Sequence, residues 1–295
     1  MRKRVVGQGT FGRVVVCEEK CTGRRAALKL FDDADGTEAR VEINNYRKMA
    51  AMGGHPSILP MLDADPSPPT PWIALPLVPG GSLSQVLMAA DDTTLPSQAR
   101  HGLVVQMVGA VAWLHSSKMA HLDIKPKNML LDQLRMTLFL CDFGSTVSTD
   151  EDGRITPDQG GELCNGGEGG VAGVTAHYRA PELWKAPLTL STRCFPVDVF
   201  ALGCSVSEVF SGRPLMDSMG HGPCSSTQDV RRRMEDWCGA WRRRRGTALV
   251  ELLQTPSHLR GLVWWACSPH PSDRPQLLHM DVRFGWQGAP VPMLT

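Results

Sequence analysis

The sequence has no surplus of charge of either sign and no long apolar run. Its 295 residues carry 31 Lys and Arg against 30 Asp and Glu, a formal net charge of +1 at pH 7. Because so small a net charge creates no global field, the composition directs the chain neither to nucleic acid nor to a membrane. The longest apolar stretches, 103–114 and 197–210, are shorter than the roughly 20 residues that cross a bilayer. No secretory apolar segment follows the basic start at residues 1–4, so we expect a soluble intracellular protein, cytoplasmic or nuclear.

Paired cysteines are also lacking. The nine cysteines are odd in number and scattered, which suits a reducing compartment better than a disulfide framework. Cys17 and Cys21 are the closest pair in the first hundred residues, and no second pair follows at metal-ligand spacing. The cysteine pattern therefore predicts no zinc site.

The chain contains enough apolar residues, 42% of the total, to bury a sizeable core. Its first ninety residues read as strands at 4–6, 14–17, 25–31 and 72–77, with one helix at 37–52. The remainder reads as helices at 97–115, 197–211, 229–241, 247–254 and 259–267. Seven glycines between residues 160 and 173 form a low-complexity segment that we expect to be mobile.

Five short motifs carry the residues that phosphoryl transfer requires. In chain order they are GQGTFGRV at 7–14, AALK at 26–29, HLDIKPKN at 121–128, DFG at 142–144 and APE at 180–182. Asp123 can accept a proton from a hydroxyl group, and Asn128 and Asp142 can bind Mg²⁺. A single glycine-rich loop would be weak support, whereas five motifs in order make coincidence negligible. From about residue 4 to about residue 284, the chain resembles the eukaryotic protein kinases of the serine/threonine type.

The resemblance implies an α+β fold of two lobes within one catalytic domain at residues 1–284. The N-terminal lobe, at about 1–77, would be rich in strands, and the C-terminal lobe, at about 83–284, would be helical. A hinge would join them at about 78–82, and a short tail would follow at 285–295. The implied function is transfer of the γ-phosphate of Mg²⁺-bound ATP to Ser or Thr hydroxyl groups of proteins. The alternative is a pseudokinase that acts as a binding scaffold.

The resemblance also assigns residues to the phosphates of ATP. Three glycines of the first motif would let backbone amides approach the phosphates: Gly7, Gly9 and Gly12. Lys29 would bind the α- and β-phosphates, held in place by a carboxylate of the following helix. Glu42 is favoured for this role over Glu38, which is only nine residues from Lys29.

The adenine ring would lie between the lobes. Leu75 would be the gatekeeper residue, with Pro76 supplying a carbonyl acceptor and Val78 an amide donor to the ring. Proline lacks only the amide hydrogen, so the carbonyl of Pro76 remains usable. Three apolar side chains would complete the adenine site: Val14, Ala27 and Leu130.

Catalysis would rest on Asp123 as the proton acceptor and on Lys125 as the residue that neutralises the transferred phosphoryl group. Lys125 at this position is typical of serine/threonine kinases. Thr175 matches a threonine that contacts both residues in that class. Asn128 and Asp142 would hold Mg²⁺. ATP and Mg²⁺ are thus the expected cofactors, and proteins with Ser or Thr acceptors the expected substrates.

Several further positions match scaffold residues of the family. Asp198 resembles the aspartate that holds the catalytic loop, and Arg274 the arginine that pairs with Glu182. This pair opposes a third interpretation, a small-molecule kinase, because such enzymes generally lack that peptide-binding platform. Cys141, beside Asp142, is expected to be a packed apolar residue rather than a reactive thiol.

Leu122 departs from the family pattern, since an arginine usually precedes the catalytic aspartate and binds a phosphate on the activation segment. No Ser or Thr occurs between residues 164 and 174, where that phosphate is usually found. The sequence therefore predicts a kinase that is not switched on by activation-loop phosphorylation.

The remaining features bear on substrate choice and subfamily. Lys127 occupies a position where kinases that prefer arginine-containing substrates often carry glutamate, so a basic substrate motif is disfavoured. The arginine clusters 231–233 and 242–245 are expected on a solvated helix face, with docking of an acidic substrate or nuclear import as alternatives. The strings LCDFGS at 140–145 and YRAPEL at 178–183 resemble the glycogen synthase kinase branch of the CMGC group and the Numb-associated kinases. No oligomeric state is predicted.

Overall fold

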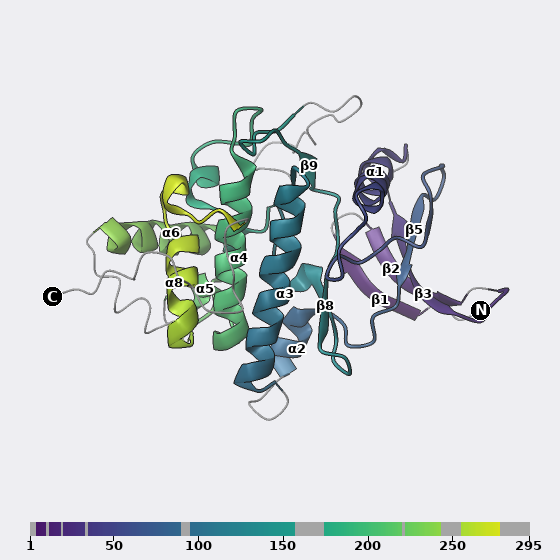
Figure 1. The fold of residues 1–295 in the computed structure, drawn as a ribbon, viewed down its shortest axis with the longest axis horizontal. Helices are drawn as coiled ribbons and strands as arrows, with labels where there is room; N and C mark the ends of the chain where they lie inside the picture. Colours follow the sequence, from purple (N-terminus) through teal and green to yellow (C-terminus); the bar gives the residue numbers. More distant parts are fainter. Residues whose placement is uncertain are drawn as a thin grey trace.

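The five-stranded sheet and most of the helices of this protein occupy opposite ends of an elongated molecule (Figure 1). The computed structural model describes residues 4–9, 12–18, 20–32, 35–89, 95–156, 174–219, 222–242 and 255–277. The predicted division into a strand-rich and a helical lobe is confirmed. The predicted helix at 247–254, the glycine-rich segment 160–173 and the tail 285–295 lie outside the described residues.

One antiparallel sheet forms the strand-rich lobe. Its strands, in spatial order, are β1 (Arg4–Gly9), β2 (Gly12–Glu18), β3 (Arg25–Phe31), β5 (Trp72–Pro76) and β4 (Asp63–Asp65). β1 and β2 are longer than the sequence predicted, because their ladder continues through the glycine-rich residues and pairs Gly9 with Gly12. Gly12 has a φ of 138°, and a Cβ there would lie 1.9 Å from the carbonyl oxygen of Leu30. Only glycine therefore allows β2 to approach β3 this closely.

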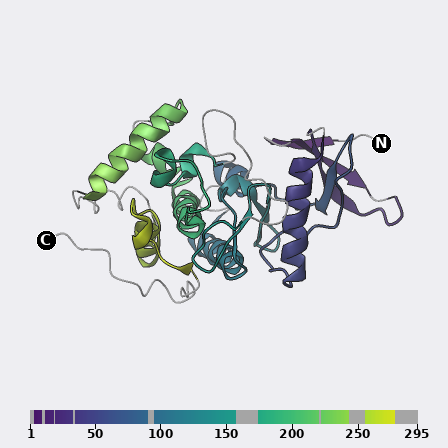
Figure 2. The same cartoon turned by 90° about the horizontal axis from the view of Figure 1, so that it is seen from above.

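Helix α1 (Thr37–Ala51) packs along this sheet, as the view from above shows (Figure 2). Ala39, Ile43, Tyr46 and Met49 are buried at helical spacing, so one face of the helix is apolar. Glu42 lies on the same buried face. The helix follows Gly36, whose φ of 71° suits glycine better than other residues.

The helical lobe is built around α4 (Cys194–Ser211). Within the described ranges, its other α-helices are α2 (Leu83–Ala89), α3 (Ser97–Ser116), α5 (Leu215–Ser218), α6 (Thr227–Arg242) and α8 (Ser257–Ala266). The sequence placed the start of α4 at residue 197, but the helix begins earlier, because Pro196 in its first turn needs no amide partner. By length and composition α4 could cross a membrane, which corrects the expectation that its apolar stretch is too short. Because 78% of it is buried, with α3 and α8 packed against it, α4 is the core helix of this lobe.

Two short two-stranded antiparallel sheets lie between the main sheet and the helices, and the polar motifs adjoin their strands. β7 (Met129–Asp132) pairs with β8 (Thr137–Leu140), and β6 (Met119–Ala120) pairs with β9 (Val147–Ser148). Leu122 and Asp142, next to these strands, adopt positive φ angles of 62° and 67°. Such backbone conformations are costly for residues other than glycine and gather at functional sites.

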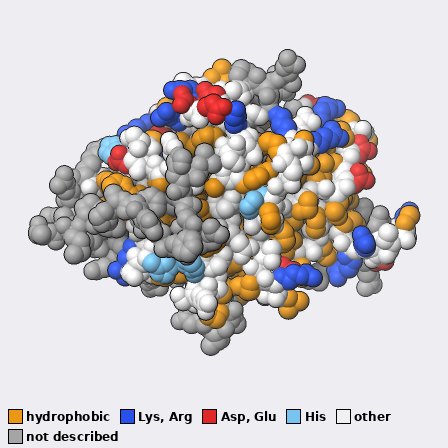
Figure 3. Space-filling model, viewed as in Figure 1, with side chains coloured by type: hydrophobic (Ala, Val, Ile, Leu, Met, Phe, Trp, Pro, Cys, Tyr) orange, Lys and Arg blue, Asp and Glu red, His pale blue; other side chains and the backbone are white. Residues whose placement is uncertain are grey.

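Short 3₁₀ turns complete the chain path: η1 (Pro126–Asn128), η2 (Ala176–Tyr178), η3 (Pro181–Trp184) and η4 (Pro271–Asp273). The surface seen in Figure 3 carries Lys and Arg next to Asp and Glu along its upper edge. On this face the charges are mixed rather than gathered by sign, as the near-zero net charge suggests.

Candidate active site

Lys29 of β3 forms an ion pair with Glu42 of α1. The distance from Lys29 Nζ to Glu42 Oε2 is 2.5 Å, and Nζ also lies 2.7 Å from Oδ1 of Asp142. The side chain of Glu42 is 1% exposed, whereas Glu38 is exposed one helical turn earlier. The pairing of Lys29 with Glu42 rather than Glu38 is therefore present as predicted.

The charges of this cluster support one another. Burial alone would lower the pKa of Lys29, but the nearby carboxylates of Glu42 and Asp142 outweigh it and raise that pKa. Burial favours the protonated form of Asp142, yet Lys29 holds the pKa of this carboxyl below its ordinary value. Lys29 is consequently a cation and Asp142 an anion at neutral pH.

Of the charged groups in this cluster, Glu42 is the one whose ionised form is most destabilised by burial. Burial raises its pKa, and the attraction of Lys29 opposes that shift. Its Oε1 atom is buried without a hydrogen-bond partner. A buried carboxylate of this kind is stable only beside its cation, so α1 and β3 are held together at this point.

A second network surrounds Asp123. Its Oδ2 atom accepts hydrogen bonds from Lys125 Nζ at 2.6 Å and from Asn128 Nδ2 at 2.8 Å. Its Oδ1 atom accepts one from Thr175 Oγ1 at 3.0 Å. Lys125 Nζ also donates to Thr175 Oγ1 at 2.6 Å. The contact of Thr175 with both residues, predicted from the motif, is thus present.

The loop that carries Asp123 is held from below by Asp198 of α4. The carboxylate of Asp198, which is fully buried, accepts hydrogen bonds at 2.8 Å from the backbone amides of His121 and Leu122. The ring of His115 lies 3.1 Å from the same carboxylate. The Leu122 side chain is 4% exposed and belongs to the apolar core. Asp198 therefore occupies the supporting position predicted for it.

Asn45 is a polar residue of this region that sequence reasoning missed. Its Nδ2 atom donates to the carbonyl oxygens of Phe143 and Thr146, each at 2.9 Å. The residue is buried and lies three positions after Glu42, on the same helix face. The available signal in the sequence was an amide residue placed three positions after Glu42, on the helix face expected to be buried. Asn45 holds the start of the segment that follows Asp142.

The predicted ATP-binding residues lie on adjacent strands. Gly7 pairs with Val14 across β1 and β2, and Val14 pairs with Lys29 across β2 and β3. Ala27 pairs with Leu75 of β5, the strand that ends at Pro76. Val78, which follows β5, and Leu130 of β7 are partly buried against the core. The sheet register thus brings together the side chains expected from the first two motifs and the hinge.

Cys141 lies directly before Asp142 and packs against the core. Its thiol contacts the carbonyl oxygen of Asn128 at 3.3 Å, and burial raises its pKa well above the ordinary value. A thiol held in its neutral form is a poor nucleophile, which fits the packing role expected for Cys141.

Farther along the chain, a partly buried ion pair joins Glu182 to Arg274. Arg274 Nη1 and Nη2 lie 2.7 and 2.8 Å from the two carboxylate oxygens, a two-pronged contact, and Nη1 also donates to the carbonyl of Pro196. Such a pair fixes both position and orientation. The predicted pairing of Glu182 with Arg274 is present.

The oxygen atoms of Asn128 and Asp142 fit a hard divalent cation. The amide nitrogen of Asn128 donates to Asp123, which leaves the amide oxygen as its ligand atom. The side chain of Asp142 uses Oδ1 for Lys29 and is 33% exposed. Mg²⁺ prefers oxygen ligands and is commonly held by one or two carboxylates together with phosphate oxygens. The residues therefore suit the Mg²⁺ ion that the motifs imply.

Comparison with known proteins relates this geometry to a family. The family described as the protein kinase domain matches residues 1–281. The chain is 30% identical over 210 residues to a probable CTD kinase subunit alpha homolog of Encephalitozoon cuniculi, covering 71% of this chain and 56% of the relative. It is 29% identical to human cyclin-dependent kinase-like 2 over 212 residues, with 72% and 39% covered. Mitogen-activated protein kinase 15 of Rattus norvegicus is 30% identical over 227 residues, with 72% and 37% covered.

These relatives support a CMGC-like kinase of the serine/threonine type, the group suggested by the strings at 140–145 and 178–183. The matches span between 37% and 56% of the length of the three relatives. On the match of residues 1–281, the chain belongs to the protein kinase domain family.

Proposed function

We propose that the chain is an active serine/threonine protein kinase that transfers the γ-phosphate of ATP to hydroxyl groups of protein substrates. The observation that carries this proposal is the simultaneous presence of the Lys29–Glu42 ion pair and the Asp123–Lys125–Thr175 network. Both belong to the arrangement that phosphoryl transfer needs, in which positioning and charge stabilisation supply most of the catalysis.

In the proposed reaction, the substrate hydroxyl attacks the γ-phosphorus and the bond from that phosphorus to the bridging oxygen of ADP breaks. Asp123 accepts the hydroxyl proton. Lys125, whose ammonium lies 2.6 Å from Asp123, neutralises the transferred group as negative charge moves onto it. Thr175 keeps these two side chains in position through its hydroxyl.

ATP would be held mainly by the strand-rich lobe. Lys29 would bind the α- and β-phosphates in place of Asp142, while Glu42 keeps its ammonium in position. The backbone at Gly7, Gly9 and Gly12 would cover the phosphates. The adenine ring would contact five residues: Val14, Ala27, Pro76, Val78 and Leu130. Bound Mg²⁺, held by Asn128 and Asp142, would offset charge on the β- and γ-phosphates.

We further propose that activity does not depend on phosphorylation of the activation segment. Leu122 is buried in the apolar core, so it offers a phosphate no charged partner. The Thr175–Asp123 contact closes the end of the segment without a phosphate group. These observations support a segment ordered by its own side chains. The subcellular site proposed for the enzyme is intracellular, in the cytoplasm or the nucleus.

The alternative, a pseudokinase scaffold, requires that one of the reacting groups be absent or misplaced. The described residues include every group that the reaction needs. Lys29 contacts Glu42 and Asp142. Asp123 contacts Lys125 and Asn128. The geometry therefore favours catalysis over a purely structural role.

Transfer of labelled phosphate from ATP to a library of Ser-, Thr- and Tyr-containing peptides tests the proposal. Replacing Asp123 by Asn should lower kcat by at least about a hundredfold, since general-base catalysis contributes that much. Asp236→Asn, an exposed aspartate on α6, is the matched control and should leave kcat unchanged. Equal phosphorylation by wild type and Asp123→Asn, or labelling of Tyr alone, would overturn the proposal.

A further inference from the structure

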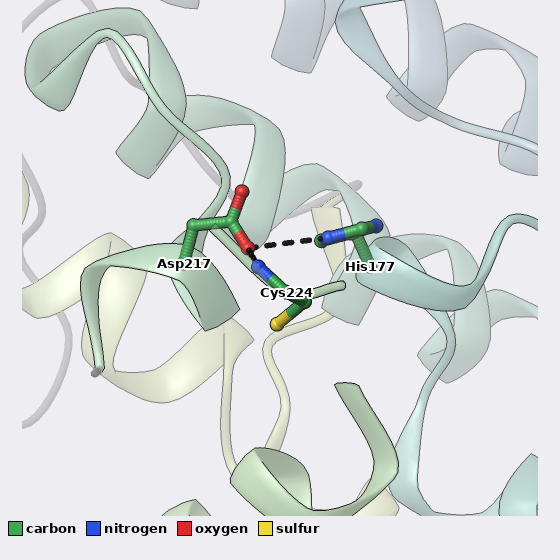
Figure 4. A group of neighbouring side chains, drawn as sticks. All are labelled: His177, Asp217 and Cys224. Atoms are coloured by element: carbon green, nitrogen blue, oxygen red, sulfur yellow. Dashed lines mark hydrogen bonds and ion pairs between the residues drawn. The ribbon is translucent and has the colours of Figure 1, made fainter. Parts of the chain in front are cut away.

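Three potential metal ligands meet beside the substrate end of the activation segment, away from Asp123 and Asp142. They are His177, Asp217 and Cys224, which come from η2, from α5 and from the loop before α6. One nitrogen, one oxygen and one sulfur atom of this cluster all lie within 4.8 Å of one another. In Figure 4, dashed lines join the carboxylate of Asp217 to the ring of His177 and to the backbone nitrogen of Cys224. Neither the motifs nor the proposed reaction uses any of them.

The geometry points to a Zn²⁺ site formed by His177, Asp217 and Cys224, and we propose that this protein binds zinc there. The inference goes beyond the proposed kinase activity and does not depend on it. It also differs from the expectation based on cysteine spacing, which considered only pairs of cysteines close in sequence. Here a single cysteine meets ligands that are 7 and 47 residues away.

The spacing of the donor atoms is close to what zinc requires. His177 Nε2 lies 3.3 Å from Asp217 Oδ1. Zinc bonds of about 2.0 Å to nitrogen or oxygen and about 2.3 Å to sulfur imply ligand separations of roughly 3.5 Å in a tetrahedral site. Bringing atoms that now lie within 4.8 Å to that separation takes a movement of about 1 Å. All three residues are only half-buried, so their side chains have room for it.

The chemistry of the donors favours zinc over the cations that bind ATP. Mg²⁺ and Ca²⁺ prefer oxygen ligands, whereas imidazole and thiolate ligands suit zinc. Three protein ligands leave the fourth tetrahedral position for water or for another group. A neutral imidazole, a carboxylate and a thiolate together balance the double charge of the ion.

The backbone around the cluster is already fixed. Nη1 of Arg233 on α6 donates to the carbonyl oxygens of Met216, Asp217 and Gly222, which flank two of the ligands. The backbone amide of Cys224 donates to Asp217 Oδ1 at 2.8 Å. Supporting contacts of this kind orient ligands before the metal arrives. Asp217 thus forms an ion pair with His177 and a hydrogen bond with the side chain of Cys224, so all three donor groups already face one another.

Zinc binding at this site should release a proton from the Cys224 thiol, and that release can be measured. A cysteine thiol with no metal beside it is mostly protonated at pH 7. Zinc binds the thiolate, so each ion that binds releases one proton and affinity increases with pH. The bound ion would join α5 and the loop before α6 to His177, two residues after Thr175. It would thus brace the segment that meets the substrate.

Zinc binding is tested on the full-length, tag-free protein after treatment with a chelator. Isothermal titration with Zn²⁺ in excess Mg²⁺ should show one site, with heats in two buffers that reveal about one proton released per ion. Co²⁺ in place of Zn²⁺ should produce a thiolate-to-cobalt charge-transfer band. Cys224→Ser should abolish that band and weaken Zn²⁺ binding at least about a hundredfold, since even supporting residues change affinity by 10–100-fold.

Matched variants make the result specific. Cys21→Ser, which removes an exposed cysteine far along the chain, should keep the band and the affinity. His177→Ala should weaken zinc binding without removing the thiol, and circular dichroism of the metal-free variants should match wild type. Zinc should raise the melting temperature of wild type but not of Cys224→Ser or His177→Ala. Absence of the cobalt band, or zinc binding unchanged in both variants, would overturn the site.

Discussion

At the scale of single residues, Asn45 shows how a buried amide can set the start of a functional segment. Its side chain donates hydrogen bonds to the backbone carbonyls of Phe143 and Thr146. Both residues follow Asp142 in a stretch that is neither helix nor strand. Removing a buried donor leaves its acceptors unsatisfied at a cost of about 1–3 kcal/mol. The position of Asp142 therefore depends on a residue nearly one hundred positions earlier in the chain.

Asn45→Ala should lower both the stability of the protein and its kcat/KM for ATP. We expect a loss of about 2 kcal/mol in the free energy of unfolding and a roughly tenfold decrease in kcat/KM for ATP, because Asp142 loses its fixed position. Asn44→Ala, its exposed neighbour on the same helix, is the control and should change neither quantity. Urea unfolding and steady-state kinetics measure the two effects. Equal behaviour of the two variants would show that Asn45 has no positioning role.

The choice between Glu42 and Glu38 gives a second prediction at this scale. Glu42→Gln should decrease kcat/KM for ATP by about tenfold to a hundredfold, the value of a lost charge-assisted hydrogen bond of roughly 1.5–3 kcal/mol. Glu38→Gln should remain near wild type, since this side chain is exposed. Kinetics at varied ATP concentration distinguish the two. A larger defect in Glu38→Gln would contradict the pairing seen between Lys29 and Glu42.

At the scale of elements, the activation segment is tied down at both ends of its described parts. Asn45 and the pairing of β6 with β9 hold its beginning, and the contact of Thr175 with Asp123 holds its later part. The residues between 157 and 173 lie outside the described structure. Residue 122 is leucine, so the described contacts that hold the segment do not include an arginine at this position that could bind a phosphate.

Phosphatase treatment of the purified enzyme should therefore leave most of its activity. A phosphate on this segment would lack the charge-assisted bonds that usually order it, so its coupling to turnover should be small. Leu122→Arg alone should create no dependence on phosphorylation. Activity assays before and after treatment, with phosphosites located by mass spectrometry, make the measurement. A tenfold decrease, reversed by rephosphorylation within residues 142–182, would show this interpretation of Leu122 to be wrong.

At the scale of the whole molecule, one buried acid makes stability depend on pH. Glu208 of α4 accepts a hydrogen bond from the Tyr178 hydroxyl at 2.6 Å. Burial raises the pKa of Glu208 from 4.5 to about 7, with a further contribution from Asp217. Below pH 4.5 the acid is protonated in both folded and unfolded chains. Between that pH and about 7 only the unfolded chain ionises, so stability is lost as the pH rises through this window.

Glu208→Gln should remove that loss, because the amide keeps an acceptor for Tyr178 and cannot ionise. The free energy of unfolding of wild type should fall relative to the variant by about 3 kcal/mol between pH 4.5 and 7.5, and then stay constant. Urea unfolding at several pH values measures the difference. Glu151→Gln, an exposed glutamate, is the control. A stability difference that does not change with pH would rule out an ionisation at Glu208.

The sequence by itself determined the family, the main strands and helices and most of the candidate site, but it predicted neither α2 nor the short strands β6 to β9. Short motifs such as HLDIKPKN place Asp123, Lys125 and Asn128 on one tight loop, so their proximity follows from local chain geometry. Glu42 was identifiable because its spacing from Lys29 and its helix face left one reachable carboxylate. Strand ends were less predictable, since pairing with a neighbouring strand carried β1 and β2 through glycines that favour turns by themselves.

Only the tertiary structure brought together residues whose partners are distant in sequence. Asn45 finds its acceptors about one hundred residues later, Tyr178 meets Glu208 across two segments, and His177 meets Asp217 and Cys224. None of these contacts follows a spacing rule, because each depends on how α1, α4 and α5 pack around the loops between them. Local patterns encode the chemistry of a motif, whereas burial and long-range packing decide which other polar groups share its surroundings.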